Sequence, residues 1–236
     1  MKLLKKLKKK RRKSGKAHSE YSVMAGLLSG HPVGVIFDVG ANHGHVSKVL
    51  LDTLKPKQLF AFEPFAETAE SLRTNLAPFA NVEIRQMAVG NFDGEVDLNI
   101  NKNTIYNNSL LDAADGADKW HDIDHVAKQT VKSTRIDSFC DAEGISEIDV
   151  LKVDAEGADF LVVEGAERML AEKKVKMVYV EVLLTDSFVG QASLGRFIEF
   201  IEGHGYELCN FFGHKIDENG RLFRTDVLFV DSLMLT

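Results

Sequence analysis

The chain has 236 residues, 44% of them hydrophobic, which is enough for the core of one domain of ordinary to large size. The first 16 residues carry ten of the 29 Lys and Arg residues and no acid, so the rest of the chain holds 19 basic residues against 35 acidic ones. Such an acidic body disfavours nucleic acid as a partner, and no apolar run approaches the roughly 18 residues needed to span a membrane.

The N-terminal part, residues 1–30, is expected to be a basic tail followed by a lead-in helix, and one domain is expected over residues 31–236. Within residues 1–13 three leucines can share a helical face opposite lysines, which fits weak contact with an anionic membrane surface. A solvated charge run is preferred, because three leucines bury little area. Cys140 and Cys209 form no spacing motif and no signal peptide is found, so we expect a cytoplasmic protein with reduced thiols, at most peripheral to a membrane.

Beyond residue 31, apolar runs and helical patterns alternate along the chain. Buried strands are expected at 35–39, 59–62, 82–87, 148–153 and 176–182, and helices at 41–54, 65–76, 160–170 and 194–201. Between the third and fourth of these strands we expect a turn at Asp93-Gly94, strands at 96–100 and 131–136, and a short helix capped by Asp137; a hairpin of 206–212 with 226–230 closes the chain. Residues 101–130 are polar and weakly periodic, and we interpret them as a substrate loop.

This order of elements predicts an α/β, Rossmann-like fold with an open, mostly parallel sheet and a C-terminal antiparallel hairpin. Ligands on such sheets bind at the carboxyl ends of the strands. Five residues with ligand-binding potential lie at or near those ends: Asp38, Gly40, Glu63, Asp154 and Glu181.

The turn after the first strand favours a sulfonium cofactor over a dinucleotide. A dinucleotide site needs three glycines, but this turn has Gly40 and Gly44 with Asn42 between them. Asp38 would repel a pyrophosphate yet suits a positively charged ligand, and Glu63 can accept two hydrogen bonds from a ribose diol. These features fit S-adenosylmethionine (SAM) better than NAD, which leaves an NAD-linked oxidoreductase as the alternative.

Three sequence motifs then occur in a familiar order. They are Phe37-Asp-Val-Gly-Ala-Asn-His-Gly44, Phe62-Glu63-Pro64 and Leu151-Lys-Val-Asp-Ala-Glu-Gly157, with Ala88-Val-Gly90 between the last two. Over about residues 35–231 the chain resembles the FkbM family of SAM-dependent methyltransferases; the basic tail is not part of the resemblance. The resemblance implies a class I methyltransferase fold and methyl transfer to a hydroxyl, often on a sugar or a secondary metabolite.

The cofactor residues expected from this reading are Asp38, Gly40, Asn42, Gly44, Glu63, Met87 and Ala88. Met87 would lie near the adenine if the third strand ends there, although as an apolar residue it is equally well explained as core. A non-catalytic, cofactor-binding scaffold docked to a membrane by the basic tail is a further alternative.

A hydroxyl acceptor needs a base to take its proton. Asp154 is the first candidate, followed by Glu156 and Glu181. Lys152 faces the same side of its strand as Asp154, so it can hold that carboxylate, act as a base if desolvated, or pair with Glu181. The three acids could also grip a divalent cation, but no motif fixes such ligands, so no metal ligand is predicted. His121 would share a helical face with a second histidine four residues later, and a substrate-loop or surface role is preferred for both.

Overall fold

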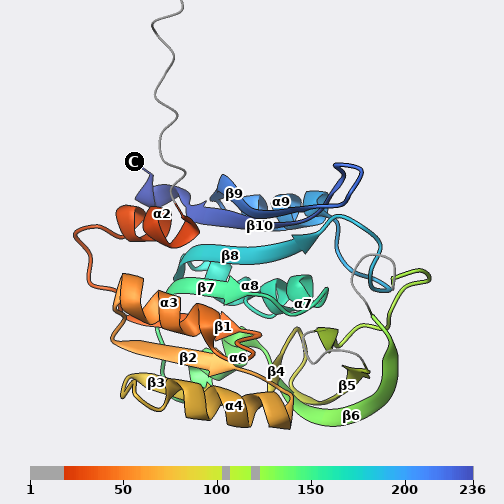
Figure 1. The fold of residues 1–236 in the computed structure, drawn as a ribbon. Helices are drawn as coiled ribbons and strands as arrows, with labels where there is room; N and C mark the ends of the chain where they lie inside the picture. Colours follow the sequence, from red (N-terminus) through yellow and green to blue (C-terminus); the bar gives the residue numbers. More distant parts are fainter. Residues whose placement is uncertain (1–18, 103–106, 118–122, 236) are drawn as a thin grey trace, which may run out of the picture.

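The computed structural model describes residues 19–102, 107–117 and 123–235 (Figure 1). The basic tail and His121 lie outside these residues. The strands are β1 Val35–Val39, β2 Gln58–Phe62, β3 Val82–Arg85, β4 Ala88–Val89, β5 Gly94–Asn101, β6 His125–Thr134, β7 Ile148–Val153, β8 Val175–Leu183, β9 Tyr206–Ile216 and β10 Leu222–Asp231. The helices are α2 Glu20–Leu27, α3 His45–Leu54, α4 Ala66–Leu76, α6 Ile136–Glu143, α7 Asp159–Glu164, α8 Glu167–Ala171 and α9 Leu194–Gly203.

The main sheet has seven strands in the order β3-β2-β1-β7-β8-β10-β9. The first five of these strands are parallel, whereas β10 runs antiparallel to both β8 and β9. The predicted open, mostly parallel sheet with a C-terminal antiparallel hairpin is therefore confirmed. The strand order reverses direction beside β1 and β7, which is where an open α/β sheet presents a crevice for ligands.

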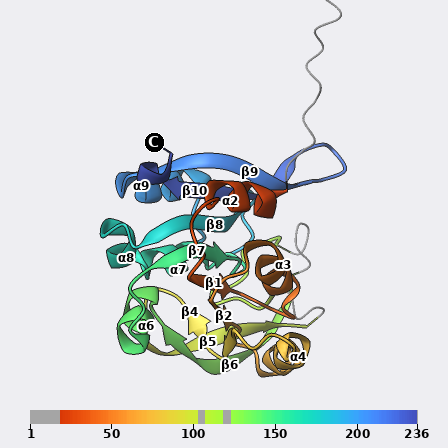
Figure 2. The same cartoon turned by 90° about the vertical axis from the view of Figure 1, so that its left-hand side faces the viewer.

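The sheet is covered on both faces because its central strands are apolar on both sides. Ile36 of β1 packs into a core with α2, α3 and α4, while Phe37 faces the opposite core, which includes Phe139 of α6. Figure 2 shows α3 and α4 on one side of the sheet and α6 and α8 on the other. In the described part of the chain, no helix combines the length and the apolar character needed to cross a bilayer.

A small second sheet departs from the prediction. The expected strand 82–87 divides into β3 in the main sheet and β4 in a three-stranded sheet of order β4-β6-β5. This sheet lies beyond one end of the main sheet, near the carboxyl ends of β1 and β2 (Figure 1). It brings Met87 and Ala88 to the site described below.

The predicted cap at Asp137 is wrong in an informative way. Arg135 is the N-cap residue of α6, and the carboxylate of Asp137 accepts hydrogen bonds from the backbone N–H groups of Arg168 and Met169 instead. Asp137 therefore caps the start of α8, some thirty residues away. The expected helix over 160–170 is divided into α7 and α8 around Gly165, where a Cβ atom would lie 2.0 Å from the carbonyl oxygen of Gly90.

Candidate active site

A cavity of about 410 Å³ opens at the carboxyl ends of β1, β2 and β7. Eight of the residues predicted from the sequence line it: Gly40, Asn42, Glu63, Met87, Ala88, Lys152, Asp154 and Glu156. Its size lies within the range of pockets that bind small molecules and cofactors. Three other predicted residues do not line the cavity: Asp38, Gly44 and Glu181. Each of them has its own position in the structure, described below.

The turn after β1 touches the loop after β7. Gly40 has φ of +70°, and a Cβ atom there would lie 1.8 Å from the carbonyl oxygen of Asp154. The N–H of Asp154 donates in turn to the carbonyl oxygen of Val39 at 3.1 Å. Only glycine permits this approach, so Gly40 joins the cofactor turn to the loop that carries the candidate base.

Gly44 begins α3 and does not line the cavity. It is the N-cap residue in the left-handed conformation, and its Cα faces Leu72 and Leu76 of α4. Close packing of α3 against α4 explains why a glycine is needed here, and contact of Gly44 with the cofactor stays a prediction.

Glu63 presents a fixed carboxylate to the cavity. Oε2 accepts from the N–H of Asn42 at 3.1 Å and Oε1 from the N–H of Phe65 at 3.0 Å. Burial raises the pKa of this carboxyl group to about 7, against the opposing effect of the two N–H groups. Each oxygen keeps a lone pair for a ligand hydroxyl, so a ribose diol fits this side chain.

Asp38 does not face the cavity. The residue is fully buried, and its carboxylate accepts from the Ser47 hydroxyl at 2.5 Å and pairs with the Lys152 ammonium at 2.9 Å. A direct contact between Asp38 and a sulfonium group is thus a prediction that the structure corrects. Asp38 acts on the site through Lys152.

Lys152 is held as a buried cation. It is 3% exposed, its Nζ donates to the carbonyl oxygens of Val39 and Gly40 at 3.2 Å each, and it lies 3.7 Å from the carboxylate of Asp154. Burial by itself lowers the pKa of the ammonium, but the Asp38 and Asp154 carboxylates outweigh it and raise that pKa above its usual value. A charged Lys152 cannot act as a base, so of its expected roles the structure retains that of holding Asp154.

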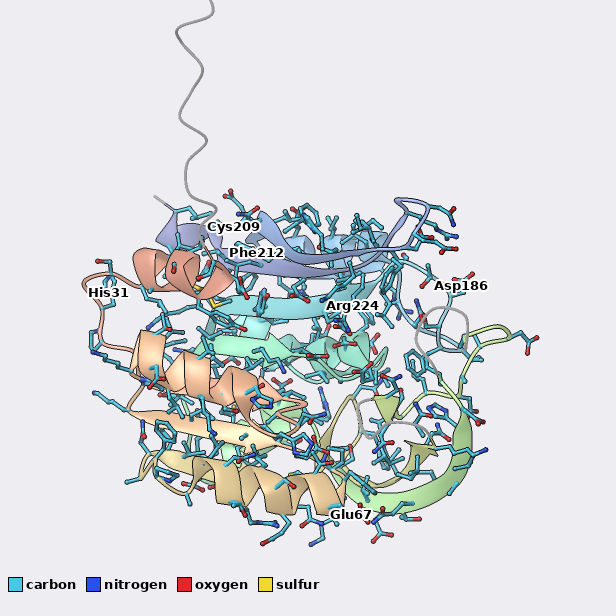
Figure 3. The ribbon with its side chains drawn as sticks, in the orientation of Figure 1. His31, Glu67, Asp186, Cys209, Phe212 and Arg224 are labelled. Atoms are coloured by element: carbon cyan, nitrogen blue, oxygen red, sulfur yellow. The ribbon has the colours of Figure 1, made fainter. Side chains whose placement is uncertain are left out.

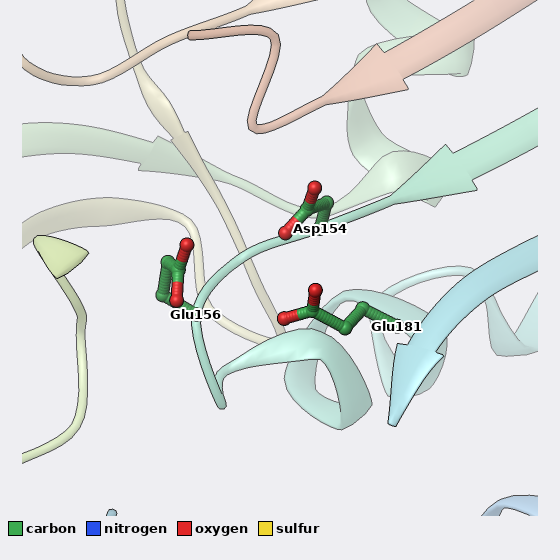
Figure 4. Close-up of side chains that lie close together, drawn as sticks. All are labelled: Asp154, Glu156 and Glu181. Carbon is green, nitrogen blue, oxygen red and sulfur yellow. The ribbon is translucent and has the colours of Figure 1, made fainter. Parts of the chain in front are cut away.

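Three carboxylates meet beside the cavity. Asp154, Glu156 and Glu181 each have an oxygen within 4.8 Å of the others (Figure 4). Glu181, from the end of β8, is 4% exposed and pairs with Arg224 at 3.0 Å, so the expected pair of Lys152 with Glu181 is wrong. Burial and then mutual repulsion raise the pKa values of Glu156 and Glu181 well above the usual range.

Two further residues shape this cluster. Arg224 reaches the cavity from β10 (Figure 3) and was not anticipated, because its place opposite the end of β8 depends on the antiparallel register. The sequence hints at a role for Arg224 only in that a basic residue occurs within a largely apolar strand. Asp159 accepts from the N–H groups of Ala155 and Gly157 at 2.8 and 3.0 Å, which fixes the loop after β7, and burial followed by the repulsion of Asp154 raises its pKa to about 7.

The expected substrate loop contributes to the site in part. Asn107 and Asn108 line the cavity. His125 does not lie on a helix, as the histidine pair would require, but starts β6; its ring nitrogen Nε2 lies 3.1 Å from the carbonyl oxygen of Asn107, and its ring stacks on Phe188. The proposal of a shared helical face is therefore wrong for His125.

The sheet order and the cavity at its switch point define a class I methyltransferase fold. Known structures agree: an FkbM methyltransferase from Methylobacillus flagellatus KT is similar with a TM-score of 0.53 and 16% identity, over 84% of this chain and 43% of that one. TrmK of M. capricolum, solved with S-adenosyl-homocysteine, has a TM-score of 0.50 and 10% identity, over 89% of this chain and 67% of that one. The chain thus spans less than half the length of the solved FkbM protein.

The Methyltransferase FkbM domain matches residues 38–208, so the chain belongs to the FkbM family of SAM-dependent methyltransferases. A curated relative, the 2-O-methyltransferase NoeI of Sinorhizobium fredii (strain NBRC 101917 / NGR234), is 25% identical over 177 residues, which is 72% of each chain. Family membership decides against the NAD-linked oxidoreductase that the glycine pattern left open.

Proposed function

We propose that this protein transfers a methyl group from SAM to a hydroxyl group on a sugar, a glycan or a small metabolite. The observation that carries the proposal is that one cavity is lined both by Glu63, suited to a ribose diol, and by the carboxylates of Asp154 and Glu156, suited to a hydroxyl. The relative NoeI, named as a 2-O-methyltransferase, supports a hydroxyl acceptor.

The residues of the cavity fit the cofactor. Glu63, oriented by the N–H of Asn42, would accept hydrogen bonds from the ribose hydroxyls, and the turn through Gly40 and Asn42 lines the same cavity. The acids on the cavity wall suit a sulfonium cation. When bound, SAM supplies a methyl carbon that accepts a lone pair of the acceptor oxygen while the electron pair of the carbon–sulfur bond returns to sulfur.

The chain itself must remove the acceptor proton and align the oxygen. We assign proton removal to Asp154, whose carboxylate lies on the cavity wall and is about a third exposed. The Lys152 ammonium, 3.7 Å away and itself fixed by Asp38, holds this carboxylate in place. The proton passes from the hydroxyl to the Asp154 carboxylate as the new oxygen–carbon bond forms.

An amide group in the expected substrate loop supports an acceptor with several hydroxyl groups. Asn108 lines the cavity and its Oδ1 accepts from the N–H of Asn101, whereas its buried Nδ2 has no hydrogen-bond partner in the described residues. A buried amide donor without a partner is costly, and an acceptor hydroxyl would satisfy it.

The test is transfer of a labelled methyl group from SAM into fractionated glycan, small-metabolite and lipid extracts. Asp154→Asn is expected to lower transfer by roughly 10²–10⁴-fold while S-adenosylhomocysteine (SAH) binds within a few-fold of wild type in calorimetry. Glu67→Gln, at an exposed position on α4 (Figure 3), is the matched control for losing one carboxyl group. Unchanged transfer by Asp154→Asn would remove Asp154 from the mechanism, and wild-type protein that binds SAH but methylates no fraction would favour the scaffold alternative.

A further inference from the structure

We propose that Asp154, Glu156 and Glu181 bind a divalent cation next to the acceptor. One oxygen from each of these side chains lies within 4.8 Å of the others. A divalent cation bound at about 2.1–2.5 Å from its oxygen ligands holds those oxygens at most about twice that distance apart. The three side chains come from two chain segments, the loop after β7 and the end of β8, and face a common space (Figure 4).

The Glu181 carboxylate gives an independent indication of a ligand. Its Oε1 pairs with Arg224, but Oε2 is buried and has no hydrogen-bond partner among the residues that the structure describes. Figure 4 shows this carboxylate turned toward Asp154 and Glu156. A buried carboxyl oxygen needs a positive or hydrogen-bonding partner, and a cation held between the three side chains would supply one.

The side chains around the cluster favour a cationic ligand. Asp159 and Asp226 add further carboxyl groups close to those of the cluster. Arg224 pairs with one carboxyl group of the cluster, that of Glu181. Lys152 is already paired with Asp38 at 2.9 Å, closer than its 3.7 Å to Asp154, so the carboxyl groups of the cluster outnumber the basic side chains beside them.

The ligand atoms select the kind of cation. All three are carboxylate oxygens, with no His or Cys in the cluster, which suits Mg²⁺, Mn²⁺ or Ca²⁺ rather than Zn²⁺. A hydroxyl group that replaces water on such a cation loses its proton more readily. Each carboxylate gives the cation one oxygen, so the second oxygen of Asp154 remains to receive that proton.

The experiment is a Mn²⁺ titration of the full chain without SAM or acceptor, by calorimetry and by the electron paramagnetic resonance of free Mn²⁺. We expect one saturable site in wild type, at least about tenfold weaker binding in Glu156→Gln and in Glu181→Gln, and unchanged binding in Glu67→Gln. SAH binding by each variant shows that it is folded, and two separate variants guard against a defect peculiar to one.

Wild-type protein without a saturable Mn²⁺ site, or Glu156→Gln and Glu181→Gln that both bind Mn²⁺ as tightly as wild type, would overturn the cation site. Failure of the cation site can be distinguished from failure of the proposed function. Methyl transfer that persists in EDTA without any Mn²⁺ site would leave the proposed function standing and remove the cation. Wild-type protein that binds Mn²⁺ but methylates no extract would support the cation site and count against the proposed function.

Discussion

The Glu63 carboxyl group should make stability and cofactor affinity respond to pH in opposite directions. The residue is 7% exposed, and burial raises its pKa from an ordinary 4.5 to about 7, although the N–H groups of Phe65 and Asn42 favour the ionised form. The native state therefore binds this proton more tightly than the unfolded state. Replacing Glu63 by Gln removes the proton equilibrium while keeping the shape of the side chain.

The size and sign of the effect follow from linkage. The interval from 4.5 to about 7 corresponds to ~3 kcal/mol of unfolding free energy, at about 1.4 kcal/mol for each pH unit. Stability from this group is fully present below pH 4.5 and is lost as the pH rises through 7. Glu63→Gln escapes that loss, so it should gain about 2–3 kcal/mol relative to wild type between pH 5 and pH 8. A pH-independent loss of ~1 kcal/mol is added, because an amide has one acceptor oxygen for two N–H donors.

Urea unfolding at pH 5, 6, 7 and 8, followed by circular dichroism, measures this difference. Glu67→Gln, exposed on α4, controls for the removal of a carboxyl group. The same difference in unfolding free energy between wild type and Glu63→Gln at pH 5 and at pH 8 would show that burial does not raise the pKa of Glu63.

Affinity for SAH should change the other way. If Glu63 binds the ribose as proposed, its ionised form would accept from both hydroxyls, so the ligand would favour the form that burial disfavours, and wild-type affinity should rise from pH 6 to pH 8. Calorimetry on Glu63→Gln should give roughly tenfold weaker binding without this rise.

Two further predictions concern the contacts that hold the site in place. Lys152→Met leaves Asp38 buried without its cationic partner, so urea unfolding should show a loss of about 3–5 kcal/mol in unfolding free energy. The double variant Asp38→Asn, Lys152→Met should recover part of this loss. An equal loss in the single and the double variant would contradict the pairing of Lys152 with Asp38. Gly40→Ala should weaken both SAH binding and stability, because its Cβ would overlap the Asp154 carbonyl oxygen, whereas Gly30→Ala, with positive φ and nothing within 4 Å, measures the backbone cost alone in the same assays. Equal effects of the two alanines would argue against the steric account.

The two strands that lead into the site could be predicted from the sequence alone. The bounds expected for β1 and β7, Val35–Val39 and Ile148–Val153, are those of the structure. Both strands are mainly apolar, are rich in β-branched residues and are buried on both faces, and each ends in a turn that needs unusual backbone conformations. The cofactor class followed from equally local chemistry, a turn that lacks the middle glycine of a dinucleotide site and an acid after the second strand.

The partners of the charged residues were decided only by the tertiary structure. Asp38 was expected to face a ligand and instead lies against Ser47 and Lys152. Glu181 pairs with Arg224, not with Lys152. Nothing local to these residues distinguishes an acid that lines a cavity from one that is buried behind it, because both follow an apolar strand.

The physical reason lies in how a sheet is assembled. Which side chains meet across strands depends on the strand order and register, and these are set by packing of the whole core. β8 pairs with β10 in an antiparallel register that brings Arg224 from near the C-terminus to the end of β8. The same arrangement brings Glu181 to within 4.8 Å of Asp154 and Glu156. The sequence thus specified a cofactor turn and a set of acids, and the fold alone determined that three of those acids form one cluster.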